Sequence, residues 1–575
     1  MQSLIRSISN LLSCAIQEEF PDLSDQEIEV VKAKDISFGD YQCNSAMKWA
    51  KVIGISPREI ASKIVERVKS KDTGLFSSVE VAGPGFINIR LRPSFLAALV
   101  QKIATADSLI ELDAHPQKIV IDFSSPNIAK EMHVGHLRST IIGDCLSRVF
   151  EFLGHNVLRL NHVGDWGTAF GMLIEHIKSQ PDFSLEKIRQ YSLSDLMCLY
   201  RESKARFDED PEFRKQAQLE VVALQSGEKE AMAIWQIICQ ISEAAYQQIY
   251  DLLDVRIEVR GESFYNPMLP KIIQELQDKG YVVDSEGAKC LFPKGFCNRE
   301  GNPLPLMLQK SDGGYTYDTT DMAALAHRVR EEHADRIIYV TDSGQSTHFQ
   351  MLFESAREAK ILPPDVRADH VPFGLVLGPD GKKFRTRSGE TEKLIDLLEA
   401  AVDYAEKILR EKNSDWPEYR SIAEILGIGA VKYADLSSHR ASDYCFSYDR
   451  MLRFEGNTAA FIMYSYVRIL SIQRKIGRSE PKPIGSFALE HTSERALAKL
   501  ILQFKEVLDE IAETLLPNRL TEYLYALSEA FNAFFRDCRV EGDPHQEERL
   551  LLVGLTARTL KQGLELLGIG VPERM

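Results

Sequence analysis

Hydrophobic and polar positions change their spacing twice along the chain, and each spacing predicts a different kind of structure. The first 20 residues show the spacing of an amphipathic helix, and "VEVAGPGFINIRL" (79–91) alternates as a strand does. From residue 115, short apolar runs typical of buried parallel strands are separated by amphipathic stretches. After about residue 395 helical spacing dominates, which indicates a helical bundle.

A strand–helix–strand unit is predicted between residues 115 and 163. "HPQKIVIDF" (115–123) is its first strand and "NVLRLNHV" (156–163) is its second. Between them apolar residues recur at helical spacing from Leu137 to Leu153, and Gly154 stands where a glycine ends many helices. Such a unit has a right-handed crossover, so its two strands lie parallel in one sheet.

Two more runs, "DRIIYVTD" (335–342) and "VPFGLVL" (371–377), predict further strands of this sheet, and charged helical patterns indicate a helical insertion. The predicted fold class is therefore α/β. It consists of a doubly wound, parallel, Rossmann-like sheet with a helical insertion, an N-terminal α/β domain and a C-terminal all-α bundle. We place the domains at residues 1–110, 111–390 with the insertion at about 175–300, 391–450 and 451–575.

Composition narrows the class of protein. The 575 residues, 44% hydrophobic and 27% charged, describe a soluble globular protein. Apolar runs stay far below the roughly 18–20 residues that cross a bilayer, and no signal-peptide cleavage pattern follows the first helix. Nine dispersed cysteines without a C-x-x-C pair predict reduced thiols in the cytoplasm and no zinc site.

The net charge of −15 argues against indiscriminate binding to nucleic acids, which requires a generally basic surface. Two local basic stretches, "GKKFRTR" (381–387) and "QRKIGR" (473–478), still allow an RNA partner. Most such runs are simply solvated faces of the protein. Charge alone therefore does not decide whether RNA is bound.

The stretch "SSPNIAKEMHVGHLRST" (124–140) contains the most distinctive chemistry in the chain. It lies between the first predicted strand and its helix, where ligands bind in open α/β sheets and where a helix N-terminus attracts anions. Nucleotidyl transfer to a carboxylate needs orientation and donors around the phosphorus rather than a protein nucleophile. An H-x-G-H pattern alone is weak, because a pair of histidines on a helix is more often structural. The polar candidates here are Asn127, Lys130, His133 and His136, with Gly135 leaving room for a ring or a phosphate at the backbone.

Together with five other stretches, this one resembles the class I aminoacyl-tRNA synthetases, and most of all the arginyl-tRNA synthetases. The resemblance covers nearly the whole chain, and several long motifs in order are far more specific than any one of them. The other stretches are "NHVGDWGTAFG" (161–171), "DGGYTYDTTDMAA" (312–324), "DSGQSTHFQM" (342–351), "FEGNTAAFIMYSYVRI" (454–469) and the terminal "VPERM".

The resemblance implies roles for residues around the predicted sheet. His133 and His136 would bind the ATP phosphates and stabilise the adenylation transition state, while Asn127 would help to hold the amino acid. Arginine needs carboxylates and planar acceptors that match its guanidinium, and Asp122 at a strand end is a further fitting acid. The ATP-binding signature then comprises Pro126, Asn127, Lys130, His133, Gly135 and His136, and the arginine site comprises Asp122, Asn127, Tyr317, Asp321 and Gln345.

The second signature of this class, Lys-Met-Ser-Lys-Ser, is replaced here by "KFRTR" (383–387). Thr386 stands where the catalytic lysine is expected. The cations that remain nearby are Lys382, Lys383, Arg385 and Arg387, and Lys130 is a substitute suggested by the family. Which cation replaces the missing lysine stays open.

The resemblance also implies contacts with transfer RNA. The N-terminal domain, and "FGDYQCNSAM" (38–47) in particular, would contact the RNA elbow, and the C-terminal bundle would bind the anticodon. Tyr464, Tyr466 and Met575 are candidates for a stacking or apolar platform there, although aromatic residues at helical spacing are often core.

The implied function is an arginine–tRNA ligase of protein synthesis. Its partners would be L-arginine, ATP with Mg²⁺ and tRNA(Arg), with no zinc, no organic prosthetic group and no membrane. We expect a cytoplasmic monomer whose first step needs bound tRNA. Two alternatives remain: a nucleotidyltransferase that activates a small carboxylate without RNA, and a catalytically silent RNA-binding paralogue.

Overall fold

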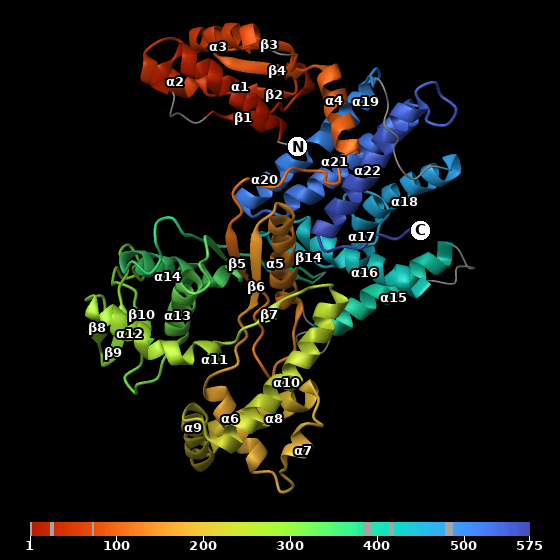
Figure 1. Ribbon diagram of the computed structural model, residues 1–575. Helices are drawn as coiled ribbons and strands as arrows, with labels where there is room; N and C mark the ends of the chain where they lie inside the picture. Colours follow the sequence, from red (N-terminus) through yellow and green to blue (C-terminus); the bar gives the residue numbers. More distant parts are fainter. Residues whose placement is uncertain are drawn as a thin grey trace. The chain divides into compact units, whose positions relative to one another are not determined.

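The computed structural model describes residues 3–23, 28–71, 74–378, 380–382, 393–412, 419–477 and 487–575 (Figure 1). The chain divides into two compact units. One comprises Met1–Leu112, Arg453–Glu565 and Gly570–Met575, and the other comprises Asp113–Leu452 with Leu566–Ile569. The first unit therefore joins the two ends of the chain, and the second is built from its middle.

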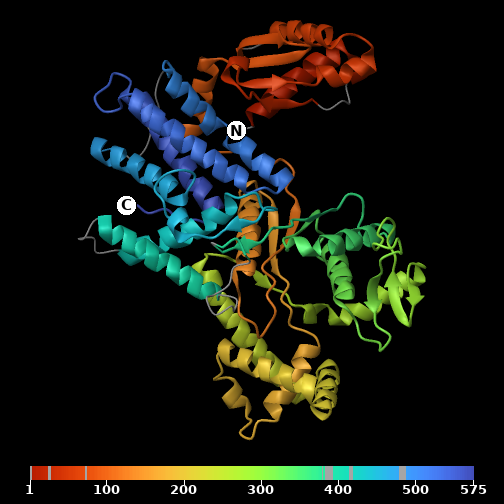
Figure 2. The ribbon, with the colours of Figure 1, turned by 180° about the vertical axis from the view of Figure 1, so that it is seen from behind.

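The second unit is built on a parallel sheet with the strand order β12-β11-β5-β6-β7. Its strands β5, β6 and β7 are labelled in Figure 1, and Figure 2 shows the same unit from behind. Every neighbouring pair is parallel, so the carboxyl ends of the strands meet at one edge. The apolar residues of the central strand are fully buried, as its continuous apolar run predicts. The strands are β5 (Lys118–Asp122), β6 (Asn156–Asn161), β7 (Glu258–Val259), β11 (Arg336–Tyr339) and β12 (Arg367–His370).

Helices of this unit pack on the sheet and extend from it. The predicted helix after β5 is α5, and Gly154 follows its end with a φ of +99°, which confirms the expected C-terminal glycine. One core cluster joins the sheet residues Val120, Leu160 and Ile337 to α12, α13 and α14. The helices are α5 (Val134–Phe152), α6 (Thr168–Lys178), α7 (Leu185–Ile188), α8 (Leu193–Glu209), α9 (Pro211–Gln225), α10 (Lys229–Leu252), α11 (Glu262–Tyr265), α12 (Leu269–Asp278), α13 (Tyr317–Arg330), α14 (Ser346–Glu358), α15 (Leu394–Lys412), α16 (Tyr419–Leu436) and α17 (Tyr448–Met451).

Two predictions for this unit were wrong in detail. The strand expected at 371–377 is not part of the parallel sheet, whose edge strand is the preceding β12. The sequence did not reveal β12 as a strand because it carries charged residues, of which Asp369 pairs with Arg336 at 2.7 Å. Instead β13 (Val376–Leu377) pairs with β14 (Tyr444–Cys445), and Pro372 lacks the N–H that a central strand must donate.

A small antiparallel sheet, β10-β9-β8, begins inside the helical insertion expected at about 175–300 and ends just beyond it. Its strands are β8 (Val283–Ser285), β9 (Ala288–Leu291) and β10 (Leu306–Gln309). Its first turn places Glu286 and Gly287 at φ values of +51° and +81°, as a tight hairpin requires. These strands have only three or four residues, which is too few to show a clear alternating pattern in the sequence.

The first unit combines a four-stranded antiparallel sheet, in the order β1-β2-β4-β3, with helices from both chain ends. The single strand expected at 79–91 is a hairpin that turns at Gly83 and Gly85, where φ is +51° and +150°. The N-terminal elements are α1 (Leu4–Glu19), β1 (Val30–Lys32), β2 (Tyr41–Cys43), α2 (Ala46–Ile53), α3 (Pro57–Lys71), β3 (Phe76–Ala82), β4 (Phe86–Leu91) and α4 (Pro93–Ala104). The C-terminal helices are α18 (Ala459–Ile476), α19 (Thr492–Leu502), α20 (Phe504–Thr514), α21 (Asn518–Asp537) and α22 (Gln546–Leu566).

Polar contacts tie the two chain ends together inside this unit. The buried carboxylate of Glu506 accepts the N–H of Ile5 at 2.9 Å and the hydroxyl of Tyr41 at 3.0 Å. Lys499 pairs with Asp40 at 2.6 Å. The N-terminal sheet and the C-terminal helices are therefore packed as one body. Within the described residues, no helix has both the length and the apolar character needed to cross a membrane.

Candidate active site

A cavity of about 450 Å³ lies at the carboxyl ends of β5 and β11, the edge of a parallel sheet at which ligands bind. The loop after β5, the start of α5, the loop after β11 and residues 373–376 line it. Five predicted site residues come together here: Asn127, His133, Gly135, His136 and Gln345.

The two histidines are held by the backbone at the start of α5. His133 is the N-cap residue, and its Nδ1 accepts the N–H of Gly135 at 3.0 Å. In return, the N–H of His133 donates to Nδ1 of His136 at 3.0 Å. Because each Nδ1 is an acceptor, a neutral ring carries its proton on Nε2. Burial, and then the neighbouring His133, lower the pKa of His136 to about 3, so this imidazole is neutral at physiological pH.

Gly135 is required by the packing of the first imidazole. A Cβ at this position would lie 2.8 Å from Cε1 of His133. The sequence predicted that the glycine leaves room for an approaching ring, and the ring that takes this room is that of His133 itself. The glycine therefore sets the orientation of the histidine.

The loop between β5 and α5 is strained and is held in place by side chains from other elements. Three non-glycine residues have positive φ values: Ser124 at +71°, Ser125 at +49° and Ala129 at +60°. Such strain persists only where the surroundings impose it, and it clusters at functional sites. The N–H of Ser124 donates to Ser139 at 2.8 Å, that of Ser125 to Asn161 at 2.9 Å and that of Ala129 to Ser242 at 3.0 Å.

The loop after β6 supports the same site. The N–H of Gly164 donates to the carbonyl of Pro126 at 3.1 Å, and a Cβ on Gly164 would lie 2.2 Å from Oδ1 of Asn127. The absence of a side chain at Gly164 thus leaves the space that the Asn127 amide occupies. This explains why "NHVGDWG" (161–167) accompanies the first motif.

Three of the five residues expected to bind arginine, Tyr317, Asp321 and Gln345, lie at the starts of α13 and α14. Oδ2 of Asp321 is 2.7 Å from Nε2 of His348, and the ring of Tyr317 lies 5.3 Å from that of His348. Gln345, at the start of α14, donates to Oδ2 of Asp342 at 3.0 Å. Gln345, which lines the cavity, and His348, which contacts Asp321, are thus one helical turn apart at the start of α14.

Glu262, the first residue of α11, is a site residue that the sequence did not reveal. Burial raises the pKa of this carboxyl to about 8, and the nearby charges of Asp321 and Asp165 add to the effect. A perturbed acid beside a predicted substrate ligand is a candidate for function. Among 84 acidic residues no spacing rule distinguishes it, because its neighbour Asp321 is 59 positions away in sequence.

Two predicted residues lie in other surroundings. Asp122 is buried, pairs with the guanidinium of Arg328 at 2.6 Å and accepts the hydroxyl of Ser125 at 3.1 Å, which favours a structural role. Lys130 is exposed, and its ammonium lies 5.6 Å from the ring centre of Tyr200, outside the residues that line the cavity.

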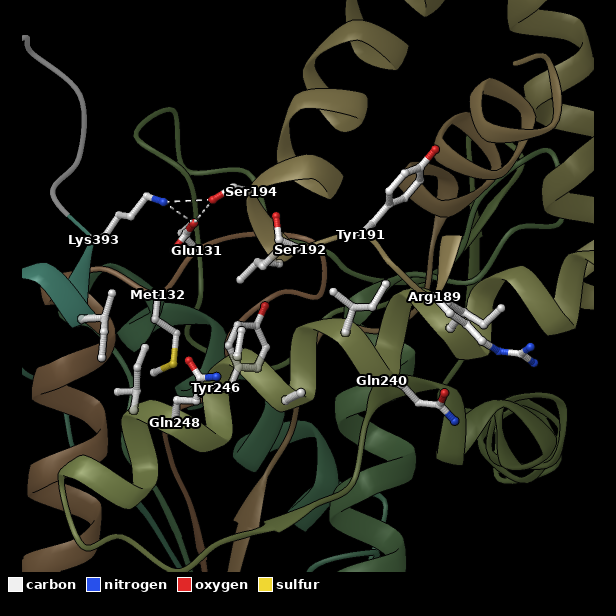
Figure 3. A pocket seen from close by; sticks show the side chains of 17 residues that line it. Glu131, Met132, Arg189, Tyr191, Ser192, Ser194, Gln240, Tyr246, Gln248 and Lys393 are labelled. Carbon is white, nitrogen blue, oxygen red and sulfur yellow. Dashed lines mark hydrogen bonds and ion pairs between the residues drawn. The ribbon is translucent and has the colours of Figure 1, made fainter. Parts of the chain in front are cut away.

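Of the second-signature residues, Lys383, Arg385, Thr386 and Arg387 lie outside the described residues. Lys382 is exposed, and its N–H donates to Asp380 at 3.1 Å. Lys393, the next described residue along the chain, bridges to His133 in an antiparallel backbone pair. Its ammonium is 2.7 Å from Glu131 and 3.1 Å from the hydroxyl of Ser194, which itself donates to Glu131 (Figure 3). These three side chains edge a second cavity of about 540 Å³ beside α10.

Comparison with known proteins assigns the chain to a family. A family model described as "tRNA synthetases class I (R), catalytic domain" matches residues 98–448. Models of the "Arginyl tRNA synthetase N terminal domain" and the "DALR anticodon binding domain" match residues 6–91 and 462–575. The chain belongs to the arginyl-tRNA synthetase family.

Full-length relatives support this membership. A protein of Protochlamydia amoebophila named arginine–tRNA ligase is 56% identical, and one of Synechococcus elongatus is 50% identical, each with both chains fully covered. The crystal structure of arginyl-tRNA synthetase from Plasmodium falciparum superimposes with a TM-score of 0.86 at 34% identity, again over both complete chains. Class I synthetases use ATP, and arginyl-tRNA synthetases act on arginine and tRNA.

The candidates for RNA contact in this chain differ in exposure. Tyr464 is 48% exposed on α18, whereas Tyr466 is 9% exposed and packs into the unit. Burial, followed by the charges of Glu565 and Glu573, raises the pKa of Tyr466. Met575 is partly exposed at the chain end. The structure thus favours Tyr464 over Tyr466 as a stacking surface.

Proposed function

We propose that the cavity at the start of α5 is the adenylation site, where L-arginine is activated with ATP before it is transferred to tRNA(Arg). A carboxylate oxygen of arginine attacks the α-phosphorus, and the bond from this phosphorus to the bridging oxygen breaks. Pyrophosphate leaves with the electron pair, and arginyl-adenylate remains. The terminal ribose hydroxyl of the tRNA then attacks the arginyl carbonyl, and AMP is released.

The observation that carries this proposal is the backbone-fixed pair of imidazoles. With Nδ1 of each ring accepting a backbone N–H, the Nε2–H groups of His133 and His136 are the donors for the phosphates. A neutral donor that is fixed before the reaction stabilises charge in the transition state without reorganising. The N-terminus of α5 adds partial positive charge at the same place. Mg²⁺ enters with ATP, whose phosphates supply its ligands.

The guanidinium of the substrate is assigned to the acidic group formed by Asp321 and Glu262, with Tyr317 beside it. Carboxylates match the donor geometry of a guanidinium better than any other side chain. Gln345 and Asn127, which line the cavity, are assigned to the amino and carboxyl groups of the amino acid. Arginine would thus extend from the cavity toward α11 and α13.

The need for tRNA in the first step is supported by the contacts of this pocket. The side-chain amide of Gln345 is bound to Asp342 at 3.0 Å. Arginine must therefore compete with an internal partner for this amide. Contact of the RNA with Tyr464 and the N-terminal sheet would accompany the rearrangement that frees the Gln345 amide for arginine. We further propose that the enzyme works in the cytoplasm as a monomer, in keeping with its nine free cysteines.

The test is ATP–pyrophosphate exchange with each of the twenty amino acids, with and without total tRNA. Exchange with arginine alone, and only with tRNA, is the expected result. Exchange with another amino acid would overturn the arginine pocket, and equal rates without tRNA would overturn the tRNA requirement. Activity that persists after removal of residues 453–575 would favour a nucleotidyltransferase that needs no RNA. No exchange at all would favour a silent RNA-binding paralogue.

A further inference from the structure

His348 lies between two carboxylates of the opposite helix. It is in the first turn of α14, and its Nε2 is 2.7 Å from Oδ2 of Asp321 while its Nδ1 is 3.1 Å from Oδ1 of Asp318. Asp318 is anchored in turn, because its Oδ2 accepts the N–H of Met307 at 2.8 Å. The imidazole side chain is 16% exposed. A partly buried ring therefore lies between two acids that are one helical turn apart on α13.

The ring is charged in this setting. Burial by itself would lower the pKa of His348, but the hydrogen bonds to Asp318 and Asp321 and the charges of both carboxylates outweigh it and raise the pKa to about 9. Other titratable groups face this cluster. They are Tyr317 on α13, Glu262 on α11 beside Asp321, and His370 on β12, whose pKa is lowered to about 4 by burial and by nearby Arg440 and His348, with Asp342 acting in the opposite sense.

We propose that His348 is a positioning residue for arginine: its imidazolium holds one oxygen of Asp321 and leaves the other for the guanidinium of the substrate. The inference rests on the proposed role of Asp321 in binding arginine. In the described part of the chain, Oδ1 of Asp321 has no hydrogen-bond partner, whereas Oδ2 is taken by His348. The helix α14 thus presents Gln345 to the cavity and, three residues later, orients the acid that selects the substrate.

The imidazolium also sets the charge of the pocket. Two carboxylates and one imidazolium leave a single negative charge, which one guanidinium neutralises. Without the imidazolium, two partly buried acids would face each other uncompensated. The imidazolium therefore both fixes the position of Asp321 and offsets the repulsion between the two carboxylates.

Exchange assays with tRNA present, at pH 7 to 10, test this role in two variants. In His348→Phe the ring keeps its bulk but loses both donors, and we expect the KM for arginine to rise roughly 10- to 100-fold with kcat and the KM for ATP nearly unchanged. His348→Gln keeps one neutral donor, and its rise should be smaller. If His348→Phe does not fold, His348→Gln carries the test by itself.

The pH dependence separates positioning from a merely structural effect. The ratio of variant to wild-type KM for arginine should fall toward one as the pH rises from 7 to 10, because wild-type His348, whose pKa is raised to about 9, then loses the proton and the charge that the variants lack. Glu262 titrates in the wild type and in the variants alike, so its effect on the KM for arginine largely cancels in the ratio. A ratio that stays near one, or is raised but independent of pH, would overturn the inference.

His176→Phe is the matched control, since it removes another buried histidine that pairs with a carboxylate, Glu202, at 3.2 Å in the helical insertion. It should leave the KM for arginine unchanged. Asp321→Asn distinguishes the two levels of the proposal. A normal KM in Asp321→Asn would refute the arginine pocket itself, whereas a raised KM there together with a normal KM in both His348 variants would refute only the role of His348.

Discussion

The N–H of His133 donates to Nδ1 of His136 at 3.0 Å, and this one bond decides where the proton of His136 resides. A ring that accepts at Nδ1 and is neutral must carry its proton on Nε2. The two histidines are spaced as in a capping box, in which the side chain of the third helical residue, His136, accepts the N–H of the N-cap residue, His133. The same geometry that begins α5 prepares the ring as a donor.

Replacing His136 by alanine removes this donor. We expect kcat for exchange to fall roughly 100- to 1000-fold, as for other preorganised donors, with the KM for arginine nearly unchanged. His155→Ala is a suitable control, because His155 pairs with Asp113 at 3.1 Å away from the lining of the cavity. Equal losses in the two variants would contradict the assignment.

The pH profile of kcat tests the charge state of the same ring. Burial lowers the pKa of His136 to about 3, so the imidazole stays neutral from pH 5 upward. We expect no ionisation of this ring in exchange assays between pH 5 and 8, with arginine and ATP saturating. An acid limb near pH 6 that disappears in His136→Gln would show that the ring is charged in the working enzyme.

Gly135→Ala tests how closely the first histidine must be positioned. The added Cβ would lie 2.8 Å from Cε1 of His133, so the ring has to move. Displacements of about 1 Å at an active site cost on the order of 100-fold in rate, and we expect a kcat loss of that order with a folded protein. The measurement is exchange kcat beside the thermal unfolding midpoint. A normal kcat would mean that the ring position is not critical.

The sequence was sufficient to predict the parallel sheet because β5 is a nearly continuous apolar run and β6 contains three apolar residues, on either side of an amphipathic helix. It failed at β12, where charged side chains pair with one another, and at β8–β10, which are too short for an alternating pattern. The signature histidines were found because their motif is local. Glu262 and His348 were missed because their importance comes from contacts with Asp321 that only the folded chain creates.

A substitution at Lys393 tests whether the segment that follows the second signature helps to position the first signature, which contains His133 and His136. Its ion pair with Glu131 holds the chain beside Met132, whose carbonyl accepts the N–H of Leu394 at 2.9 Å. Because Lys393 is 42% exposed, the pair is weak, and we expect Lys393→Gln to raise the KM for ATP only about 2- to 5-fold. Lys204→Gln, which breaks the 2.7 Å pair with Asp208 on α8, should have no effect. An unchanged KM for ATP in Lys393→Gln would show that this segment does not support the first signature.

Glu262 predicts a pH dependence of arginine binding. Burial, followed by Asp321 and Asp165, raises its pKa to about 8, so the free enzyme holds this carboxyl protonated at neutral pH. A guanidinium beside it favours the carboxylate, and binding below pH 8 must therefore release a proton. The KM for arginine should fall as the pH rises from 6 to 8, by at most about tenfold per unit.

Glu262→Gln should abolish most of that slope and leave a KM at pH 8 above that of the wild type, because the amide cannot ionise. Glu243→Gln is the matched control: burial and Asp165 also raise the pKa of Glu243, but Asp321 does not contribute. It should retain the wild-type slope. The titration of arginine itself is common to all three proteins, so a slope that survives in Glu262→Gln would place the ionising group elsewhere in the pocket.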